Sequence, residues 1–259
     1  NMLSTIWIKI IGLFSFFFLV LPFPLSATDS LSASDIVKLS DDLMRGDTNQ
    51  GIYAMEVVTP NWQRELKLDV YSLGRDKTFI RILSPAKEAG IGTLRIKNEM
   101  WNYLPNVEKT IKIPPSMMAQ SWMGSDFAND DLVKESSIVN DYTHTIVTES
   151  GIDGQPAYII IELIPKPQAP VIWGKIILLV RRADFVPLKE EYYSEKGKLI
   201  KVLEYSDIGR VSDRVIPRVW KMSSLTKPGH YTIIKLIDVA YNKPISNDVF
   251  TLENLRKIQ

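Results

Sequence analysis

The side chains that could perform catalysis are few in this sequence, and none has the spacing of a catalytic or metal site. The two histidines, His144 and His230, lie far apart, and neither has a second histidine at ligand spacing. The chain has no cysteine, so it has neither a thiol nucleophile nor a thiolate ligand. Glycine-rich phosphate loops and a G-x-S-x-G turn are also missing. We therefore predict no enzymatic activity, no metal and no cofactor.

Two adjacent acidic pairs, Asp130–Asp131 and Glu190–Glu191, are the remaining candidates for acid–base chemistry. Adjacent residues on a strand point to opposite faces, so Glu190 and Glu191 cannot share a site. Asp130 and Asp131 fall near the start of a predicted short helix, where the helix dipole favours carboxylates. We interpret both pairs as solvated surface residues, and hydrolysis of a lipid or glycan is kept only as a remote alternative.

The segment SMMAQSWMGSDF, residues 116–127, concentrates methionine and aromatic side chains. Met118, Ala119, Trp122 and Met123 recur at helical spacing, which predicts one apolar face of a short helix. Methionine is flexible and polarizable, and it is common at surfaces that accept apolar partners of variable shape. The residues alone leave two interpretations open, the lining of a ligand cavity and ordinary core.

The N-terminus has the pattern of a secretory signal peptide. Lys9 precedes an apolar run, residues 10–21, which is followed by prolines and by small residues up to Ala27. This run is shorter than the roughly 20 residues of a membrane span, so we favour cleavage after Ala27 over an uncleaved anchor. We predict a signal peptide over 1–27 and a periplasmic mature chain.

The charge balance argues against a nucleic-acid partner. The sequence has 31 Lys and Arg residues against 30 Asp and Glu, and removing Lys9 with the signal peptide leaves 30 of each. A formally neutral chain lacks the excess of basic residues that binds a polyanion.

The spacing of hydrophobic residues changes from a helical to an alternating pattern soon after the predicted signal peptide. Residues 30–46 predict a helix with Ser34 as its N-cap and Gly46 at its end, and the chain closes with helical turns capped by Ser246 and Thr251. Between them, alternation of apolar and polar residues predicts roughly eleven antiparallel strands. A sheet of that length must curl or close, because twist accumulates from strand to strand. A helix from the middle of the chain is the natural cover of its concave face.

One stretch, Arg81–Leu132, resembles a known family. Its LSPA-K-G sequence, its W-x-Y-x-P turn at Trp101–Pro105 and its MGSDF at Met123–Phe127 occur in the order seen in LolA-like proteins, the periplasmic carriers that sort outer-membrane lipoproteins. Weaker similarity extends to the closing NDVFTL, Asn247–Leu252. The resemblance implies a single mainly β domain over 28–259, an unclosed half-barrel of about eleven strands with a helical lid at 114–135.

The resemblance also implies a function. In the family, an apolar cavity binds acyl chains of lipoproteins, which arrive from an inner-membrane ABC transporter and leave to an outer-membrane receptor. For this chain we expect a monomeric carrier of lipoproteins or other lipids, with an ABC- or RND-type transporter as donor. The alternative is an envelope scaffold, an accessory protein of an exporter, whose core is filled by its own side chains.

Three groups of residues are predicted for the site. The cavity wall is expected to comprise Met55, Val57, Leu66, Leu68, Val70, Phe79, Leu94, Trp101 and Tyr103. The lid is expected to contribute Met117, Met118, Trp122, Met123 and Phe127. Members of the family keep an arginine near the third strand that holds the empty lid closed, and Arg75 and Arg81 are the two candidates here.

Overall fold

A single antiparallel sheet dominates the structure. The computed structural model describes residues 31–133, 137–150, 158–169 and 171–257, so the predicted signal peptide lies outside the described residues. The strands are β1 (Thr48–Val58), β2 (Gln63–Leu73), β3 (Lys77–Ser84), β4 (Gly92–Ile96), β5 (Glu99–Leu104), β6 (Lys109–Lys112), β7 (Tyr142–Ser150), β8 (Tyr158–Pro165), β9 (Lys175–Arg181), β10 (Pro187–Tyr193), β11 (Leu199–Val211), β12 (Arg214–Ser224) and β13 (Tyr231–Tyr241).

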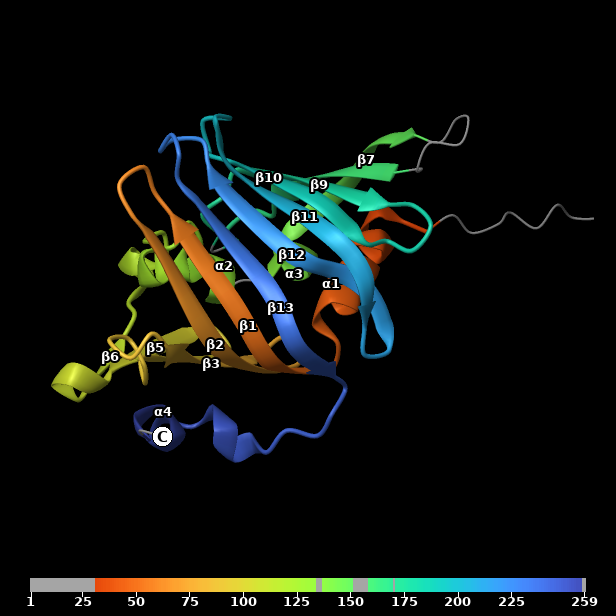
Figure 1. Ribbon diagram of the computed structural model, residues 1–259. Coiled ribbons are helices and arrows are strands. Elements are labelled where there is room, and N and C mark those ends of the chain that lie inside the picture. Colours follow the sequence, from red (N-terminus) through yellow and green to blue (C-terminus); the bar gives the residue numbers. More distant parts are fainter. Residues whose placement is uncertain (1–30, 134–136, 151–157, 170, 258–259) are drawn as a thin grey trace, which may run out of the picture. The chain divides into compact units, whose positions relative to one another are not determined.

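The order of the strands follows the chain, apart from one long-range pairing. In the part of the chain that the structure describes, the sheet runs β6-β5-β4-β3-β2-β1-β13-β12-β11-β10-β9-β8-β7. The pairing of β1 with β13 joins the two halves of the chain. The sheet curls but does not close into a barrel (Figure 1). This confirms the predicted half-barrel class, with thirteen strands in place of about eleven.

The helices are short and few among the described residues. They are α1 (Ala33–Arg45), α2 (Asn129–Val133), α3 (Ser137–Asn140) and α4 (Leu252–Arg256), together with the 3-10 turns η1 (Pro105–Val107), η2 (Pro115–Met117), η3 (Trp122–Gly124) and η4 (Asn247–Phe250). No helix in these ranges is both long enough and apolar enough to cross a membrane. Figure 1 shows α1, α2 and α3 on the concave side of the sheet and α4 outside it.

Helix α1 begins two residues earlier than expected. Its N-cap is Ser32, whose hydroxyl accepts the Asp35 N–H at 3.2 Å, while the Asp35 carboxylate accepts the Ser32 N–H at 3.1 Å. This reciprocal capping box satisfies two N–H groups that would otherwise have no partner in the helix, so it outweighs a cap at Ser34. The Ser34 hydroxyl instead bonds the His144 ring at 2.9 Å. Gly46 ends the helix as predicted, with its N–H bonded to the Asp42 carbonyl.

The Met-rich segment is not the predicted helix. It forms the two 3-10 turns η2 and η3, and a β-bridge between Ser121 and Ala128 folds it back on itself. Met123 and Gly124 both have positive φ, 49° and 73°, which an α-helix does not allow. The helix predicted from the spacing of these apolar residues is therefore wrong.

The C-terminal segment packs on the outer face of the sheet. Its caps, Ser246 and Thr251, are confirmed, because their hydroxyls accept the N–H groups of Asp248 and Asn254. Leu255 of α4 is fully buried above β4. At Gly92 in β4, an added Cβ would lie 2.7 Å from the Leu255 Cδ1 atom, so the Leu255 side chain would have to shift to accommodate it.

Candidate functional site

A cavity of about 210 Å³ lies between the concave face of the sheet and the segments that cover it. Its apolar wall is contributed by strands from both halves of the chain, which the β1–β13 pairing brings together. Side chains alternate along each strand, so every second residue of a strand faces the cavity. The apolar lining includes Tyr53, Leu68, Val70, Ile80, Ile176, Leu178, Leu203, Trp220, Met222 and Ile234.

The Met-rich segment covers one part of this cavity. Trp122 and Phe127 line it and are buried. The Trp122 Nε1–H donates to the Thr93 hydroxyl at 3.1 Å, and the Arg64 guanidinium donates to the Met123 carbonyl. Polar anchors on two different strands therefore hold the segment over the sheet.

A second anchor ties the segment to β13. The Asp126 N–H donates to the Thr232 hydroxyl at 2.9 Å, and that hydroxyl donates to the Asp126 carboxylate at 2.9 Å. Burial raises the pKa of Asp126 above its ordinary value, while the hydroxyl bond and the charges of His230, Lys227 and Lys201 lower it.

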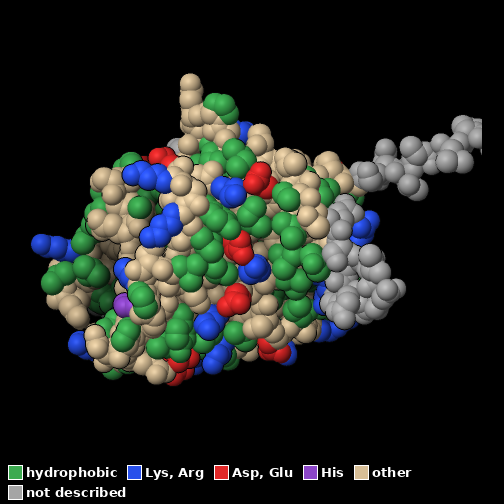
Figure 2. Space-filling model, turned by 90° about the horizontal axis from the view of Figure 1, so that it is seen from above, with side chains coloured by type: hydrophobic (Ala, Val, Ile, Leu, Met, Phe, Trp, Pro, Cys, Tyr) green, Lys and Arg blue, Asp and Glu red, His purple; other side chains and the backbone are tan. Residues whose placement is uncertain are grey.

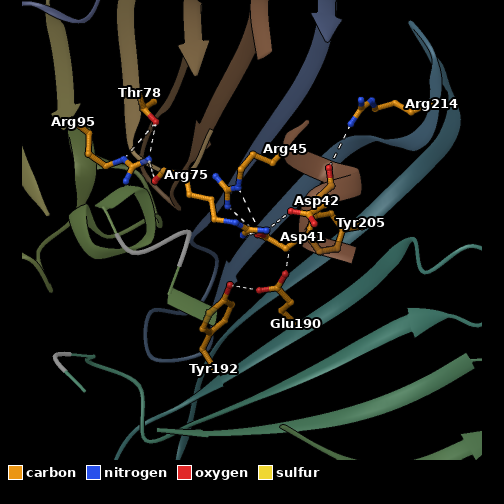
Figure 3. Close-up of polar contacts among 10 residues, drawn as sticks. All are labelled: Asp41, Asp42, Arg45, Arg75, Thr78, Arg95, Glu190, Tyr192, Tyr205 and Arg214. Atoms are coloured by element: carbon orange, nitrogen blue, oxygen red, sulfur yellow. Dashed lines mark hydrogen bonds and ion pairs between the residues drawn. The ribbon is translucent and has the colours of Figure 1, made fainter. Parts of the chain in front are cut away.

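Helix α1 closes the cavity from another side through an ionic cluster (Figure 3). Asp41 is buried and pairs with Arg45 at 2.8 Å, one turn along the helix. Arg75, in the turn between β2 and β3, pairs with both Asp41 and Asp42. The backbone carbonyl of Arg75 accepts from Arg95, which is almost fully buried. Arg75 is thus well placed to connect the sheet to α1.

The strands β10 and β11 contribute a second polar group to the wall. The Glu190 carboxylate accepts the Tyr205 hydroxyl at 2.7 Å and also the Tyr192 hydroxyl (Figure 3). Burial, together with the adjacent Glu190, raises the pKa of Tyr192 well above its ordinary value. The Tyr192 hydroxyl is therefore protonated at neutral pH and remains a donor.

A third polar group lies between β11 and α2. The Lys201 ammonium pairs with Asp131, and their side chains are only 6% and 11% exposed. The ammonium also lies 4.6 Å from the ring centroid of Trp173 and 4.9 Å from that of Tyr192. The cavity is therefore amphiphilic, with apolar strands on much of its wall and a polar region where β10, β11, α1 and α2 approach it.

Several predicted wall and lid residues do face this side of the sheet. Leu68 and Val70 line the cavity, whereas Met55, Val57 and Leu66 are buried beside it in one cluster with Met118 and Trp122. Met117 and Met123 pack against the same cluster. Their contact with a lipid stays a prediction.

The structure contradicts the predicted wall position of four residues. Phe79, Leu94 and Tyr103 pack with Phe250 and Leu255, and Trp101 packs against that cluster. They lie on the outer face, which the C-terminal segment covers. The inward residues of β3 and β4 are Thr78, Ile80, Thr93 and Arg95. Because both faces of these strands are buried, alternation of polarity does not mark the inner face there.

The two gating candidates have different surroundings. Arg75 contacts α1, as described above, while Arg81 lies on the outer face and donates to the Asn254 carbonyl of α4. Of these two candidates, Arg75 is therefore the one positioned to act on a segment that covers the cavity.

The polar wall was not predicted from the sequence pattern. Glu190 and Asp130 are buried, at 8% and 3% exposure, so the interpretation of both acidic pairs as solvated surface residues is wrong for these members. Glu191 does face outward, where it pairs with Lys189. The spacing of Glu190 and Tyr192, two residues apart on a strand, was an available signal that they share a face.

On the face seen in Figure 2, charged groups are dispersed. Figure 2 shows acidic, basic and hydrophobic side chains interspersed over the visible face. Among the described residues, no three His, Cys, Asp or Glu side chains are grouped as a metal site would require.

The curled sheet and its covered cavity define a protein with a LolA-like fold. A LolA superfamily protein from Nitrosomonas europaea has a TM-score of 0.74 and 22% identity, covering 87% of this chain and 100% of that chain. A DUF1329 family protein from Desulfovibrio piger has a TM-score of 0.78 and 21% identity, covering 86% and 97%. A Vibrio parahaemolyticus domain described as an outer-membrane lipoprotein-sorting protein has a TM-score of 0.74 and 20% identity, covering 87% and 98%.

At this level of identity, these similarities establish the fold. No curated protein matches the sequence significantly. A family model described as "Uncharacterized protein" matches residues 74–257, and the chain belongs to that family.

Proposed function

We propose that the protein is a non-enzymatic periplasmic carrier, which binds acyl chains of lipoproteins or other lipids in its cavity and moves them from the inner to the outer membrane. The observation that carries this proposal is the cavity of about 210 Å³ between an apolar curled sheet and a methionine-rich cover. The LolA-like fold and the signal-peptide pattern of residues 1–27 support it.

The physical requirement for such a carrier is a shielded apolar surface. Burial of a methylene group stabilises a bound chain by about 0.8 kcal/mol, so an acyl chain has a strong preference for the cavity over water. Release requires that the cover opens without unfolding the sheet. Short 3-10 turns with flexible methionines, attached by a few polar anchors, suit this requirement better than a tightly packed helix.

The partners in this scheme are an inner-membrane transporter of the ABC or RND type and an outer-membrane acceptor. The second candidate, an envelope scaffold with a self-filled core, shares the fold and the localisation. The cavity favours the carrier, because a scaffold has no need for unfilled space inside its sheet.

The test is lipid retention by the mature protein purified from the periplasm without detergent. Native mass spectrometry with lipid extraction should detect bound lipid in the wild type. Ile234→Trp, which adds volume at the cavity wall, should reduce the bound fraction severalfold. Ile233→Trp is the matched control, since Ile233 lies beside it on the opposite face with Glu56.

Absence of lipid in the wild type, even after incubation with phospholipids and lipoproteins, would refute the carrier and favour the scaffold. Equal loss of lipid in both tryptophan variants would show that the cavity is not where the lipid binds.

A further inference from the structure

One donor in the cavity lacks an acceptor. Trp173, just before β9, lines the cavity, and its Nε1 atom is shielded from solvent without a hydrogen-bond partner among the described residues. The two other tryptophans of the lining are satisfied: Nε1 of Trp122 donates to Thr93 and Nε1 of Trp220 donates to the Pro217 carbonyl at 3.0 Å. Buried donors are nearly always paired, so the Trp173 N–H calls for an acceptor that the described part of the chain does not provide.

The surroundings of Trp173 are rich in donors and aromatic rings. Its ring centroid lies 5.3 Å from that of Tyr192, and the Lys201 ammonium lies over both rings. An ammonium group can donate three hydrogen bonds, and Asp131 accepts one from Lys201. Trp173 thus offers an unpaired donor in the polar part of the cavity wall, while Lys201, which is not among the lining residues, lies beside it over its ring.

The acceptor that fits here is neutral. A hydrocarbon chain has no acceptor, so chain burial alone leaves the Trp173 N–H unpaired. A phosphate would meet the carboxylates of Asp130, Asp131 and Glu190, which all line the cavity and would repel it at low local dielectric. A carbonyl oxygen accepts hydrogen bonds without bringing a charge, and each acyl chain of a lipid ends in one.

We infer that the Trp173 N–H forms a subsite for the acyl carbonyl oxygen of the cargo. This inference rests on the proposed carrier function and adds to it that the cargo is recognised at the linkage between chain and headgroup. The ester carbonyl of a phospholipid and the ester or amide carbonyl of an acylated lipoprotein share this chemistry. An ether-linked lipid, which lacks the carbonyl, is expected to bind more weakly.

The experiment compares two phosphatidylethanolamines of equal chain length, one diacyl and one dialkyl. Their affinities are measured by displacement of an apolar fluorescent dye from the purified protein. Wild type should bind the diacyl lipid roughly five- to tenfold more tightly, the effect of pairing one buried donor. In Trp173→Phe this preference should fall to below about twofold, because the carbonyl has lost its donor.

Trp220→Phe is the matched control. It removes an indole from the same cavity, but one whose N–H already bonds Pro217, so the diacyl preference should persist. The preference is a ratio of two lipids on the same variant, so a general loss of folded protein cancels. A triacylated lipopeptide serves as a third ligand, and the cargo class that loses more affinity in Trp173→Phe is the source of the carbonyl.

The outcomes separate the two proposals. An unchanged diacyl preference in Trp173→Phe, or no preference in the wild type, overturns the carbonyl subsite and leaves the carrier function standing. Failure of all three ligands to displace the dye from the wild type refutes the carrier function, and the subsite with it.

Discussion

The buried ion pair between Lys201 and Asp131 holds α2 against β11, and its removal provides a sharp test of the structure. The two side chains are 6% and 11% exposed, so neither charge can regain full hydration when its partner is lost. Lys201→Met keeps most of the side-chain length and removes only the ammonium. It leaves the Asp131 carboxylate with the Ala128 N–H, at 2.6 Å, as its remaining hydrogen-bond donor in the structure.

The expected loss of unfolding free energy depends on which of the two charges is left buried without its partner. Breaking a buried pair by removing one partner destabilises a protein by about 3–5 kcal/mol. We expect Lys201→Met to fall in that range. Asp131→Asn should be milder, about 1–3 kcal/mol, because the amide oxygen still accepts from Ala128 and the ammonium still faces the rings of Trp173 and Tyr192. The double variant has no stranded charge and should be more stable than Lys201→Met.

The assay is urea unfolding at neutral pH on all four proteins, with thermal unfolding as a second measure. A loss of about 3 kcal/mol in a domain of this size corresponds to a fall of roughly 6–12 °C in Tm. Unfolding free energy for Lys201→Met within about 1 kcal/mol of wild type would refute the reasoning. So would a double variant that is less stable than Lys201→Met, since the penalty would then not arise from an uncompensated carboxylate.

Three further predictions concern other parts of the fold. Arg75→Ala should speed amide hydrogen exchange in α1 and leave exchange in the sheet unaffected, because Arg75 pairs with Asp41 and Asp42 of that helix. Arg81→Ala is the control and should leave exchange in α1 unchanged, since Arg81 contacts α4. Equal effects of the two variants on α1 would exclude a specific role of Arg75. Leu255→Ala should lower the unfolding free energy by about 2–5 kcal/mol without changing lipid affinity, and a selective loss of affinity would contradict its position outside the cavity. Asp126 holds its proton more tightly in the folded than in the unfolded state, because its pKa is raised on folding. Wild type should therefore gain stability relative to Asp126→Asn as pH falls from neutral towards 3.8, the ordinary pKa of an aspartate. A difference in unfolding free energy that stays constant with pH would refute the raised pKa.

Local signals in the sequence were informative wherever the interaction they specify is itself local. Gly46, Ser246 and Thr251 end or begin helical segments as predicted, because a cap bonds a backbone group only a few residues away. The same applies to alternation in β1 and β2, where Met55 and Leu68 were assigned to the correct face. One side of these strands is more polar, so the period of two identified the buried side.

Tertiary structure decided what the sequence could not specify. Phe79 and Leu94 face outward because Phe250 and Leu255, more than 150 positions later, cover that side of the sheet. The polar wall likewise depends on distant segments, because Asp131 of α2 meets Lys201 of β11 only when the covering segment folds over the sheet. The sequence by itself determined the mainly β class and most capping residues, since these follow from short-range periodicity and hydrogen bonding. Which side of a strand faces the cavity, and which charges are buried there, was decided by packing between segments remote in sequence.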